Sequence, residues 1–196
     1  MQVAVLQYNA GNVQSVLYAL SRLGIEGVLT DSPEILQSAD KVIFPGVGEA
    51  GSAMKYLQEK GLDQVIKNLK KPVLGICLGL QLLCKHSQES NTNCLGIFDL
   101  NVKLFPKKSD YKVPHVGWNT IYNFQDKVFG EVAEKDYVYY VHSYYAELGK
   151  ETIAQTDYIL PFSAALQKDN FWAMQFHPEK SGKVGEKLLK AFLDIH

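Results

Sequence analysis

The segment 72–83, Pro-Val-Leu-Gly-Ile-Cys-Leu-Gly-Leu-Gln-Leu-Leu, limits the possible folds of this chain more than any other stretch. Its first apolar run predicts a buried strand, and the apolar spacing from Leu78 onward predicts a helix that begins at once. Cys77 therefore lies on the turn between strand and helix. A glycine two residues before it and another two residues after it allow close packing and a strained backbone at the cysteine. The pattern is that of a nucleophile elbow with cysteine in place of serine.

The position of Cys77 favours nucleophilic chemistry. A free thiol is only partly ionised at neutral pH, and a helix N-terminus favours the reactive thiolate. The backbone N–H of Leu78, next along the turn, can stabilise an oxyanion that forms on an attacked carbonyl. The alternative is a tight turn with a small buried cysteine at its apex, because cysteine is often a core residue.

The composition predicts a single domain over residues 1–196. With 46% hydrophobic and 21% charged residues, a chain of 196 residues is long enough for one sizeable core. A total of 20 Lys plus Arg against 21 Asp plus Glu gives a formal net charge of −1, which argues against binding to nucleic acid or to an anionic membrane. The start of the chain does not resemble a signal peptide, and no run is long enough to span a membrane, so we expect a cytoplasmic protein.

The cysteines suggest neither a disulfide framework nor a thiolate metal site. There are three of them, an odd count, and no Cys-x-x-Cys pair occurs. We expect Cys84 to be a packing residue and Cys94 to be a loop thiol.

The N-terminal half alternates strand and helix patterns. Strands are predicted at 3–7, 27–30, 41–44 and in the run before Cys77, and helices at 13–23, 33–39, 50–60 and 62–69. Such alternation predicts an α/β fold with a mostly parallel, doubly wound sheet flanked by helices on both faces. Catalytic groups of such a sheet gather at the carboxyl ends of the strands, where Cys77 lies.

The C-terminal half has a different pattern. Aromatic and β-branched runs between short turns predict additional antiparallel strands at 97–104, 118–124, 137–143, 152–156, 163–168 and 171–176. A final helix is predicted at 182–193. No internal repeat, linker or low-complexity tract divides the chain.

The segment Pro45-Gly46-Val47-Gly48 follows a predicted strand directly. Its glycines allow a turn whose backbone N–H groups face the neighbouring strand end, where they can complete an oxyanion hole beside Cys77. A plain glycine-rich turn is the alternative. The segment is not a phosphate-binding loop, because it lacks both the Gly-Lys-Ser/Thr ending and the dinucleotide glycine spacing.

The end of the last predicted strand, Gln175-Phe176-His177-Pro178-Glu179, presents an imidazole and a carboxylate two residues apart. The carboxylate of Glu179 can fix the tautomer of His177 and hold the ring toward a nucleophile. The tripeptide alone is weak evidence, and it gains force from its place in the same predicted sheet as Cys77. No His, Asp and Glu set with ligand spacing accompanies it, so we expect no metal.

Together these motifs resemble the class I (triad) glutamine amidotransferases. The residues that carry the resemblance are Gly75 to Gln81, Pro45 to Gly48, and Phe176 to Glu179. It narrows to the glutaminase subunits of imidazole glycerol phosphate synthases through Pro114 to Asn119, Val141 to Tyr144, and Pro178 to Ser181. The resemblance covers essentially the whole chain and implies a flavodoxin-like fold of the class I amidotransferase type.

The resemblance implies a role for each matching residue. Cys77 matches the nucleophile, His177 the general base and later acid, and Glu179 the residue that orients the base. The backbone oxyanion donors match Val47 and Leu78. The positions that hold the glutamine substrate match Gly46, Gly48, Gln81, His142, Ser143 and Tyr144.

The resemblance also implies a reaction and a partner. Such subunits hydrolyse L-glutamine to glutamate and ammonia without a cofactor. They pass the ammonia to a (β/α)8-barrel cyclase subunit, with which they form a heterodimer that serves histidine biosynthesis. Because uncoupled hydrolysis wastes glutamine, we expect the oxyanion hole to be assembled only in the partnered state, through a turn of the segment 45–48.

Candidate interface residues are Asn12, His115, Trp118 and Lys180. The chain departs from the family at 7–12, where Asp-Tyr-Gly-x-Gly-Asn is usual, and at 49–51, where a bulkier aromatic residue often occurs. Both departures lie on the expected partner side, so they affect the expected cyclase contacts more than the expected hydrolysis.

Three alternatives stay open at this point. The first is a triad glutaminase for another acceptor synthase, such as the one in pyridoxal phosphate synthesis, against which His115 to Asn119 and Pro178 to Ser181 speak. The second is a cysteine hydrolase of the same fold that needs no partner. The third is a non-enzymatic module that uses the elbow as a binding turn.

Overall fold

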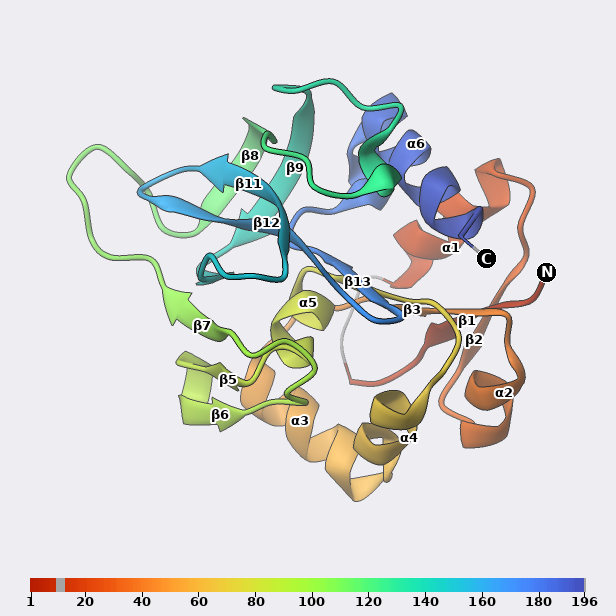
Figure 1. The fold of residues 1–196 in the computed structure, drawn as a ribbon. Coiled ribbons are helices and arrows are strands. Elements are labelled where there is room, and N and C mark those ends of the chain that lie inside the picture. Colours follow the sequence, from red (N-terminus) through yellow and green to blue (C-terminus); the bar gives the residue numbers. More distant parts are fainter. Residues whose placement is uncertain (10–12, 196) are drawn as a thin grey trace.

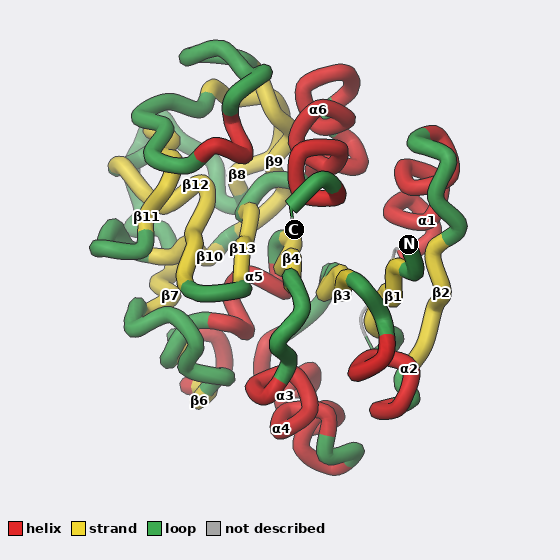
Figure 2. Tube along the Cα trace, turned by 45° about the vertical axis from the view of Figure 1, so that its right-hand side comes forward, coloured by secondary structure: helices red, strands yellow, loops and turns green. Residues whose placement is uncertain are grey.

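A central sheet organises the computed structural model, which describes residues 1–9 and 13–195 (Figures 1 and 2). In this part of the chain the sheet has seven strands, in the order β11 (Thr152–Asp157), β12 (Pro161–Lys168), β13 (Phe171–Met174), β4 (Val73–Ile76), β3 (Lys41–Phe44), β1 (Val3–Leu6) and β2 (Gly27–Thr30). The strands from β13 to β2 are parallel to one another. The β11 and β12 strands extend the sheet by antiparallel pairing. The predicted α/β class with a mostly parallel sheet is confirmed.

Helices cover both faces of this sheet (Figure 1). On one face lie α1 (Val13–Arg22) and α6 (Gly182–Leu193), and on the other lie α2 (Pro33–Ser38), α3 (Ala50–Glu59), α4 (Leu62–Asn68) and α5 (Leu78–Leu83). The helix α6 shows why: its buried residues Gly185, Leu188, Leu189 and Phe192 recur at helical spacing and form one apolar face. In the described ranges no helix is long and apolar enough to cross a membrane.

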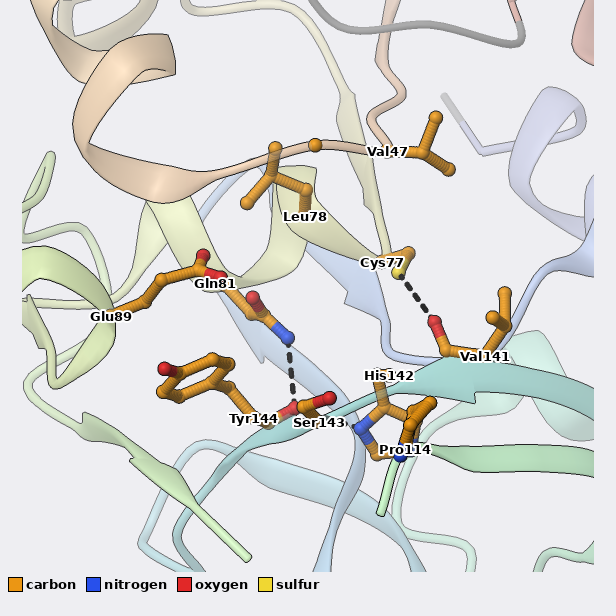
Figure 3. A pocket seen from close by; sticks show the side chains of 11 residues that line it. Val47, Cys77, Leu78, Gln81, Glu89, Pro114, Val141, His142, Ser143 and Tyr144 are labelled. Carbon is orange, nitrogen blue, oxygen red and sulfur yellow. Dashed lines mark hydrogen bonds between the residues drawn. The ribbon is translucent and has the colours of Figure 1, made fainter.

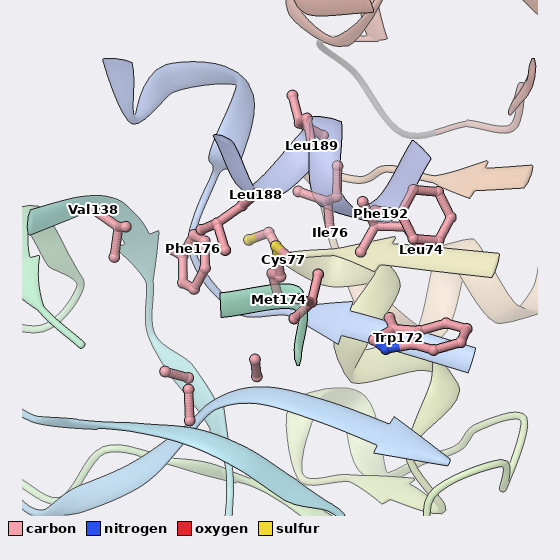
Figure 4. Close-up of a cluster of buried hydrophobic side chains, with 14 of the residues drawn as sticks. Leu74, Ile76, Cys77, Val138, Trp172, Met174, Phe176, Leu188, Leu189 and Phe192 are labelled. Atoms are coloured by element: carbon pink, nitrogen blue, oxygen red, sulfur yellow. The ribbon is translucent and has the colours of Figure 1, made fainter. Parts of the chain in front are cut away.

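The two layers of helices bury two hydrophobic clusters, one on each face of the sheet. Figure 4 shows the cluster under α6, where Leu74 and Ile76 of β4 and Met174 of β13 pack against Leu188 and Phe192. Each fully buried side chain of this kind contributes roughly 1.5–3 kcal/mol. The strands that carry the elbow and the end of β13 are thus among the most firmly packed parts of the molecule.

The turn before α3 is fixed by a capping carboxylate. Glu49 accepts hydrogen bonds from the backbone N–H groups of Gly51 (2.8 Å) and Ser52 (2.7 Å). The side chain of Ser90 and then these backbone donors lower the pKa of Glu49 to about 2. A negative charge at the positive end of the helix stabilises it, so the segment 45–48 enters α3 at a defined position.

The remaining strands form two smaller sheets. One has the order β10 (Tyr144–Ala146), β7 (Asn101–Leu104), β5 (His86–Ser87) and β6 (Thr92–Asn93). The other is a ribbon of β8 (His115–Thr120) and β9 (Tyr137–His142). Short 3₁₀ turns lie at η1 (Glu89–Asn91), η2 (Lys127–Phe129) and η3 (Pro178–Lys180).

The predicted elements of the N-terminal half agree with the structure to within one residue at each boundary. The C-terminal half needs corrections. The strand predicted at 97–104 covers only 101–104, because Ile97 and Phe98 donate to the carbonyl of Leu83 and Phe98 is buried under α5. The strand predicted at 118–124 is β8, which begins at His115.

The pairing of the last strand differs from the prediction on one side. The sequence predicts antiparallel pairing for the run 171–176, and β13 does pair in that way with β12. On its other side, however, β13 pairs parallel with β4, in the register Met174 to Ile76. This parallel pairing brings the end of β13 next to Cys77.

Candidate active site

Cys77 lies at the turn where β4 ends and α5 begins. Its backbone has φ +52° and ψ −106°, a conformation that L-residues rarely adopt. The N–H of Cys77 donates to the carbonyl of Met174 at 2.8 Å, which ties the turn to β13. Gly79 allows α5 to approach β3 closely, because a Cβ at this position would lie 1.9 Å from the carbonyl oxygen of Phe44. The turn thus holds the cysteine strained at its apex, as the sequence predicts.

His177 and Glu179 follow β13 and form a buried pair. Nδ1 of His177 lies 2.8 Å from Oε1 of Glu179, and both side chains are 2% exposed. Because a carboxylate only accepts hydrogen bonds, Nδ1 carries a proton, and Nε2 of the neutral ring is left as a proton acceptor. Nε2 has no hydrogen-bond partner among the described residues, so it is available to a thiol proton.

The charges around His177 favour its protonated form. Burial by itself lowers the pKa of the imidazole, but the negative charge of the Cys77 thiolate and the Glu179 carboxylate outweigh burial and raise the pKa of His177 to about 10. The ring of His177 therefore holds firmly a proton that it accepts from a neighbouring group.

A hydrogen-bonded link ties the backbone of His177 to the ribbon of β8 and β9. The N–H of His177 donates to the carbonyl of Tyr139 at 2.9 Å. Oγ of Ser181 donates to the carbonyl of His177 at 2.7 Å and accepts from the N–H of Tyr139 at 2.9 Å. The position of the imidazole thus depends on the ribbon as well as on β13.

The backbone donors predicted for an oxyanion hole are not both free. The N–H of Leu78 donates to the carbonyl oxygen of Gly46 at 3.3 Å. The peptide between Gly46 and Val47 therefore turns its carbonyl toward the elbow. Since the C=O and N–H of a trans peptide point in opposite directions, the N–H of Val47 points away from Leu78. In this conformation the pair does not form an oxyanion hole.

Tyr8, just after β1, holds the turn in this conformation. Its hydroxyl donates to the carbonyl of Pro45 at 2.6 Å, and its side chain is buried. A Cβ at Gly46 would lie 2.1 Å from this hydroxyl oxygen, so only glycine permits the approach. Burial, and then the charge of Cys77, raise the pKa of Tyr8, which keeps the phenol protonated as a donor.

A cavity of about 280 Å³ opens beside Cys77 (Figure 3). The residues that line it are Val47, Gly48, Cys77, Leu78, Gln81, Glu89, Pro114, Val141, His142, Ser143 and Tyr144. Most positions predicted to hold a substrate are therefore brought together from segments far apart in the sequence. Gly46 is not among the lining residues, because its carbonyl faces Leu78.

One wall of this cavity is held by a network around the carbonyl oxygen of Tyr144. That oxygen accepts from Nδ1 of His142 at 2.7 Å and from Nε2 of Gln81 at 2.9 Å. Since Nδ1 of His142 is the donor, its Nε2 accepts from Nδ1 of His115 at 3.1 Å. Burial lowers the pKa of His142 to about 3 and that of His115 to about 4, so both rings are neutral at pH 7.

Two polar residues at the site were not predicted from the sequence. Glu89 lines the cavity, its Oε2 accepts the N–H of Ala50 at 2.8 Å, and burial raises its pKa. Gln175 is fully buried, and its Nε2 lies 3.8 Å from Sγ of Cys77. Gln175 lies in a bend just after β13, outside the alternating strand pattern. No local pattern marks Glu89, which lies in a short 3₁₀ turn.

The ribbon presents apolar side chains on its outer face. Val116 and Trp118 of β8 and Tyr137 of β9 are 56%, 55% and 59% exposed. Trp118 also packs edge-on against Tyr139, with ring centroids 5.9 Å apart. Exposed aromatic and branched residues grouped on one face mark a surface suited to a protein partner.

The other candidate interface residues lie in different settings. Lys180 is exposed in η3. The expectation for His115 is corrected, since this side chain is 3% exposed and bonded to His142 inside the molecule. Asn12 lies outside the described residues. Within residues 1–9 and 13–195, no group of three His, Cys, Asp or Glu side chains is placed to hold a metal ion.

The sequence matches a known family over almost its whole length. The family model for class-I glutamine amidotransferases matches residues 4–195. The chain therefore belongs to the class-I glutamine amidotransferases.

Individual relatives show which members of this family the chain is similar to. The chain is 61% identical to the imidazole glycerol phosphate synthase subunit HisH of Bacteroides thetaiotaomicron over 196 residues, which are 100% of both chains. It is 45% identical to the HisH subunit of Escherichia coli over 199 aligned residues, again 100% of both chains. A crystal structure of a glutamine amidotransferase superposes with a TM-score of 0.76 at 21% identity, covering 99% of this chain and 98% of that one, which shows a shared fold.

Proposed function

We propose that this chain is a glutaminase subunit of imidazole glycerol phosphate synthase. It hydrolyses L-glutamine to glutamate and ammonia, and it delivers the ammonia to a barrel cyclase subunit in histidine biosynthesis. The observation that carries the proposed chemistry is the buried His177–Glu179 pair, with a free Nε2, at the strand end next to the Cys77 elbow. Full-length identity with HisH subunits supports the choice of acceptor.

The proposed reaction uses these groups in order. Sγ of the Cys77 thiolate attacks the side-chain carbonyl carbon of glutamine, whose oxygen becomes an oxyanion. His177 gives its proton to the amide nitrogen, the C–N bond breaks, and ammonia leaves a γ-glutamyl thioester on Cys77. Water that loses a proton to His177 then attacks the thioester, which releases glutamate and restores the thiolate. These steps require no cofactor.

The cavity offers partners for the rest of the glutamine molecule. Glu89 lines it with a carboxylate, and we assign this group to the α-ammonium of the substrate. Gln81, Ser143 and Tyr144 line the cavity with amide, hydroxyl and backbone groups, and they hold the α-carboxylate and the side-chain amide. The network of His142 keeps this wall in place.

The blocked Leu78 donor supports a reaction that depends on a partner. Full activity requires that the hydrogen bond between the N–H of Leu78 and the carbonyl of Gly46 breaks. The peptide between Gly46 and Val47 must also turn over, so that the N–H of Val47 faces the elbow. Glycines on both sides of Val47 make such a turn sterically possible. The cyclase docks on the ribbon face of Val116, Trp118 and Tyr137, whose strands also carry the wall of the cavity and the link to His177.

We further propose that residues 1–196 act as one amidotransferase domain. The support is that both hydrophobic clusters pack against opposite faces of the same central sheet. A cytoplasmic location stays a prediction from the sequence.

The test is glutamate release from glutamine, measured for the chain alone and after addition of a barrel cyclase subunit with its nucleotide ligand. The chain alone should be slow. The complex should show a kcat at least about a hundredfold higher with little change in KM, because one restored oxyanion donor acts on the transition state and is worth about 2.7–4 kcal/mol. Cys77→Ala should abolish this activity and leave synthesis from added ammonia by the complex intact.

The main alternative is a cysteine hydrolase of the same fold without a partner. It predicts that the isolated chain hydrolyses its substrate at full rate and that the cyclase changes nothing. That result would refute the synthase proposal. Loss of ammonia-dependent synthesis in Cys77→Ala would contradict the role given to this residue.

A further inference from the structure

Gln175 is a buried amide that no step of the proposed reaction uses. It follows β13 directly, and its exposed fraction is 0%. The residue lies in a bend between the end of β13 and His177, and its backbone N–H donates to the carbonyl of Ala164 at 2.8 Å. A buried amide is stable only when its polar atoms are hydrogen-bonded. The partners of Gln175 therefore indicate what the residue does.

The orientation of this amide is fixed by Gln81. Oε1 of Gln175 accepts from Nε2 of Gln81 at 3.2 Å, and the same nitrogen of Gln81 donates to the carbonyl of Tyr144 at 2.9 Å. Both protons of that nitrogen are thus used. Gln175 must then present its own Nε2 on its other side, where it lies 3.8 Å from Sγ of Cys77. A reversed amide would lose the bond to Gln81 and turn a carbonyl oxygen toward the sulfur.

We propose that Gln175 is a catalytic residue whose Nε2–H donates a hydrogen bond to the thiolate of Cys77. A hydrogen bond to a charged acceptor is stronger than one to a neutral acceptor, so this donor favours the thiolate over the thiol. The donor also fixes the orientation of the Cys77 side chain. Because Gln81 holds the Gln175 amide in place, rotation of the Cys77 side chain would break the hydrogen bond to the sulfur. The inference deepens the proposed glutaminase function, on which its meaning for catalysis rests.

The amide differs in kind from the ionisable groups around Cys77. These are His177 and Glu179 after β13, Tyr8 after β1, His142 in β9, and Glu89 across the cavity. Each of them can change its charge with pH, whereas the amide of Gln175 stays a neutral donor. Its removal should therefore displace the ionisation curve of the nucleophile without adding a new titration step.

Alkylation of Cys77 by iodoacetamide, measured against pH, tests this inference without glutamine or a partner. Peptide mass mapping of the full chain separates Cys77 from Cys84 and Cys94. Gln175→Met keeps the length of the side chain and removes the donor. We expect the midpoint of the alkylation curve to rise by about one pH unit, which lowers the alkylation rate about tenfold at pH values below the midpoint.

Two further variants distinguish the loss of the hydrogen-bond donor from a general loss of stability. Gln175→Asn keeps an amide that is too short to reach the sulfur, and it should shift the midpoint in the same direction. Ser163→Ala is the matched control: this fully buried hydroxyl donates to the carbonyl of Glu147 at 2.8 Å, away from the elbow. Its loss should lower the melting temperature and leave the midpoint unchanged.

In the complex with a cyclase, Gln175→Met should move the acid limb of the kcat profile up by about one pH unit, so that kcat falls about tenfold on that limb and recovers at higher pH, while KM stays nearly unchanged. An unchanged alkylation midpoint in either folded Gln175 variant would overturn the inference. That outcome, with glutamine hydrolysis by the unmodified complex intact, would leave the proposed function standing. Absence of glutamine hydrolysis by the unmodified complex would remove the proposed function and leave the alkylation result to be judged alone.

Discussion

The two sides of Cys77 differ in their state of assembly. On the side of β13, His177 is bonded to Glu179, and its Nε2 has no hydrogen-bond partner among the described residues, so the groups that we propose for proton transfer are in place. On the side of the turn 45–48, the carbonyl of Gly46 occupies the N–H of Leu78. In the proposed mechanism, the groups for proton transfer are therefore assembled, whereas the donors that would stabilise the tetrahedral intermediate are not.

If a partner assembles the turn, it will change the rate of hydrolysis and not the binding of glutamine. A missing oxyanion donor raises the barrier by about 2.7–4 kcal/mol, whereas the cavity for the substrate is already open. An enzyme of this design can hold glutamine before it hydrolyses it. The predictions below test whether the two sides of Cys77 are separable.

The largest effect is expected from breaking the assembled side. His177→Ala removes both the base and the acid, and it should lower kcat by about 10²–10⁴-fold. The factor should be the same for the chain alone and for the complex, since the pair is already formed in the chain. Glu179→Ala should cost less, because the carboxylate only orients the ring.

Steady-state kinetics of both variants, with and without the cyclase, provide the measurement. A loss that appears only in the complex would mean that the proton-transfer side also needs the partner, and the contrast between the two sides would fail. An equal or greater loss at Glu179 would mean that its role is not merely to orient His177.

A smaller and opposite effect is expected on the side of the turn. Tyr8→Phe removes the hydroxyl that donates to Pro45 and leaves the ring in place. The closed turn should lose about 0.5–1.5 kcal/mol, so the activity of the chain alone should rise about two- to tenfold while the complex keeps its rate. Tyr56→Phe, a change near the C-terminal end of α3, is the control and should alter neither rate. An unchanged rate for Tyr8→Phe alone would show that Tyr8 does not hold the blocked state.

The smallest effect near neutral pH is expected on the free energy of unfolding. Its dependence on pH has one sign for His142 and His115 and the opposite sign for His177. The pKa values of His142, about 3, and His115, about 4, lie below the ordinary 6.5. The unfolded chain therefore binds more protons below pH 6.5, and the free energy of unfolding falls as the pH falls. At pH 5 the loss is about 2 kcal/mol for each of these histidines. His177 has the opposite sign, because its raised pKa gives stability that is full below pH 6.5 and lost as the pH rises toward 10.

Urea unfolding at pH 7.5 and at pH 5 measures the acid side of this balance. His115→Gln should reduce the loss between these two values. An identical loss in His115→Gln and the unmodified chain would show that the histidines of the cavity wall do not set the acid sensitivity.

Much of the fold could be predicted because, in the N-terminal half, the pattern of neighbouring residues alone determines each strand and helix. Each strand there is a short apolar run, and each helix has one apolar face, so the boundaries follow from the sequence to within a residue. The direction of β13 is not coded in this way, since it depends on which strands lie beside it. The path of Phe98 under α5 likewise depends on contacts with Leu83, far from any strand pattern.

The same distinction applies to the site. Cys77, His177 and Glu179 stand in compact motifs, so their roles could be proposed from neighbouring residues. The orientation of the peptide after Gly46 could not, because a glycine-rich turn admits both orientations at similar energy. Gln175 has the appearance of an ordinary strand residue, and only its bond to Gln81 and its distance to the sulfur distinguish it.

The backbone of Cys77 also bears on how such proteins change over evolutionary time. Glycine would adopt its positive φ freely, whereas an L-residue there is destabilised by about 1–2 kcal/mol. Selection for a stable fold and selection for a working nucleophile therefore act in opposite directions at this position. If Cys77 is the nucleophile that we propose, a gene copy released from its catalytic duty would gain stability by replacing this cysteine with glycine.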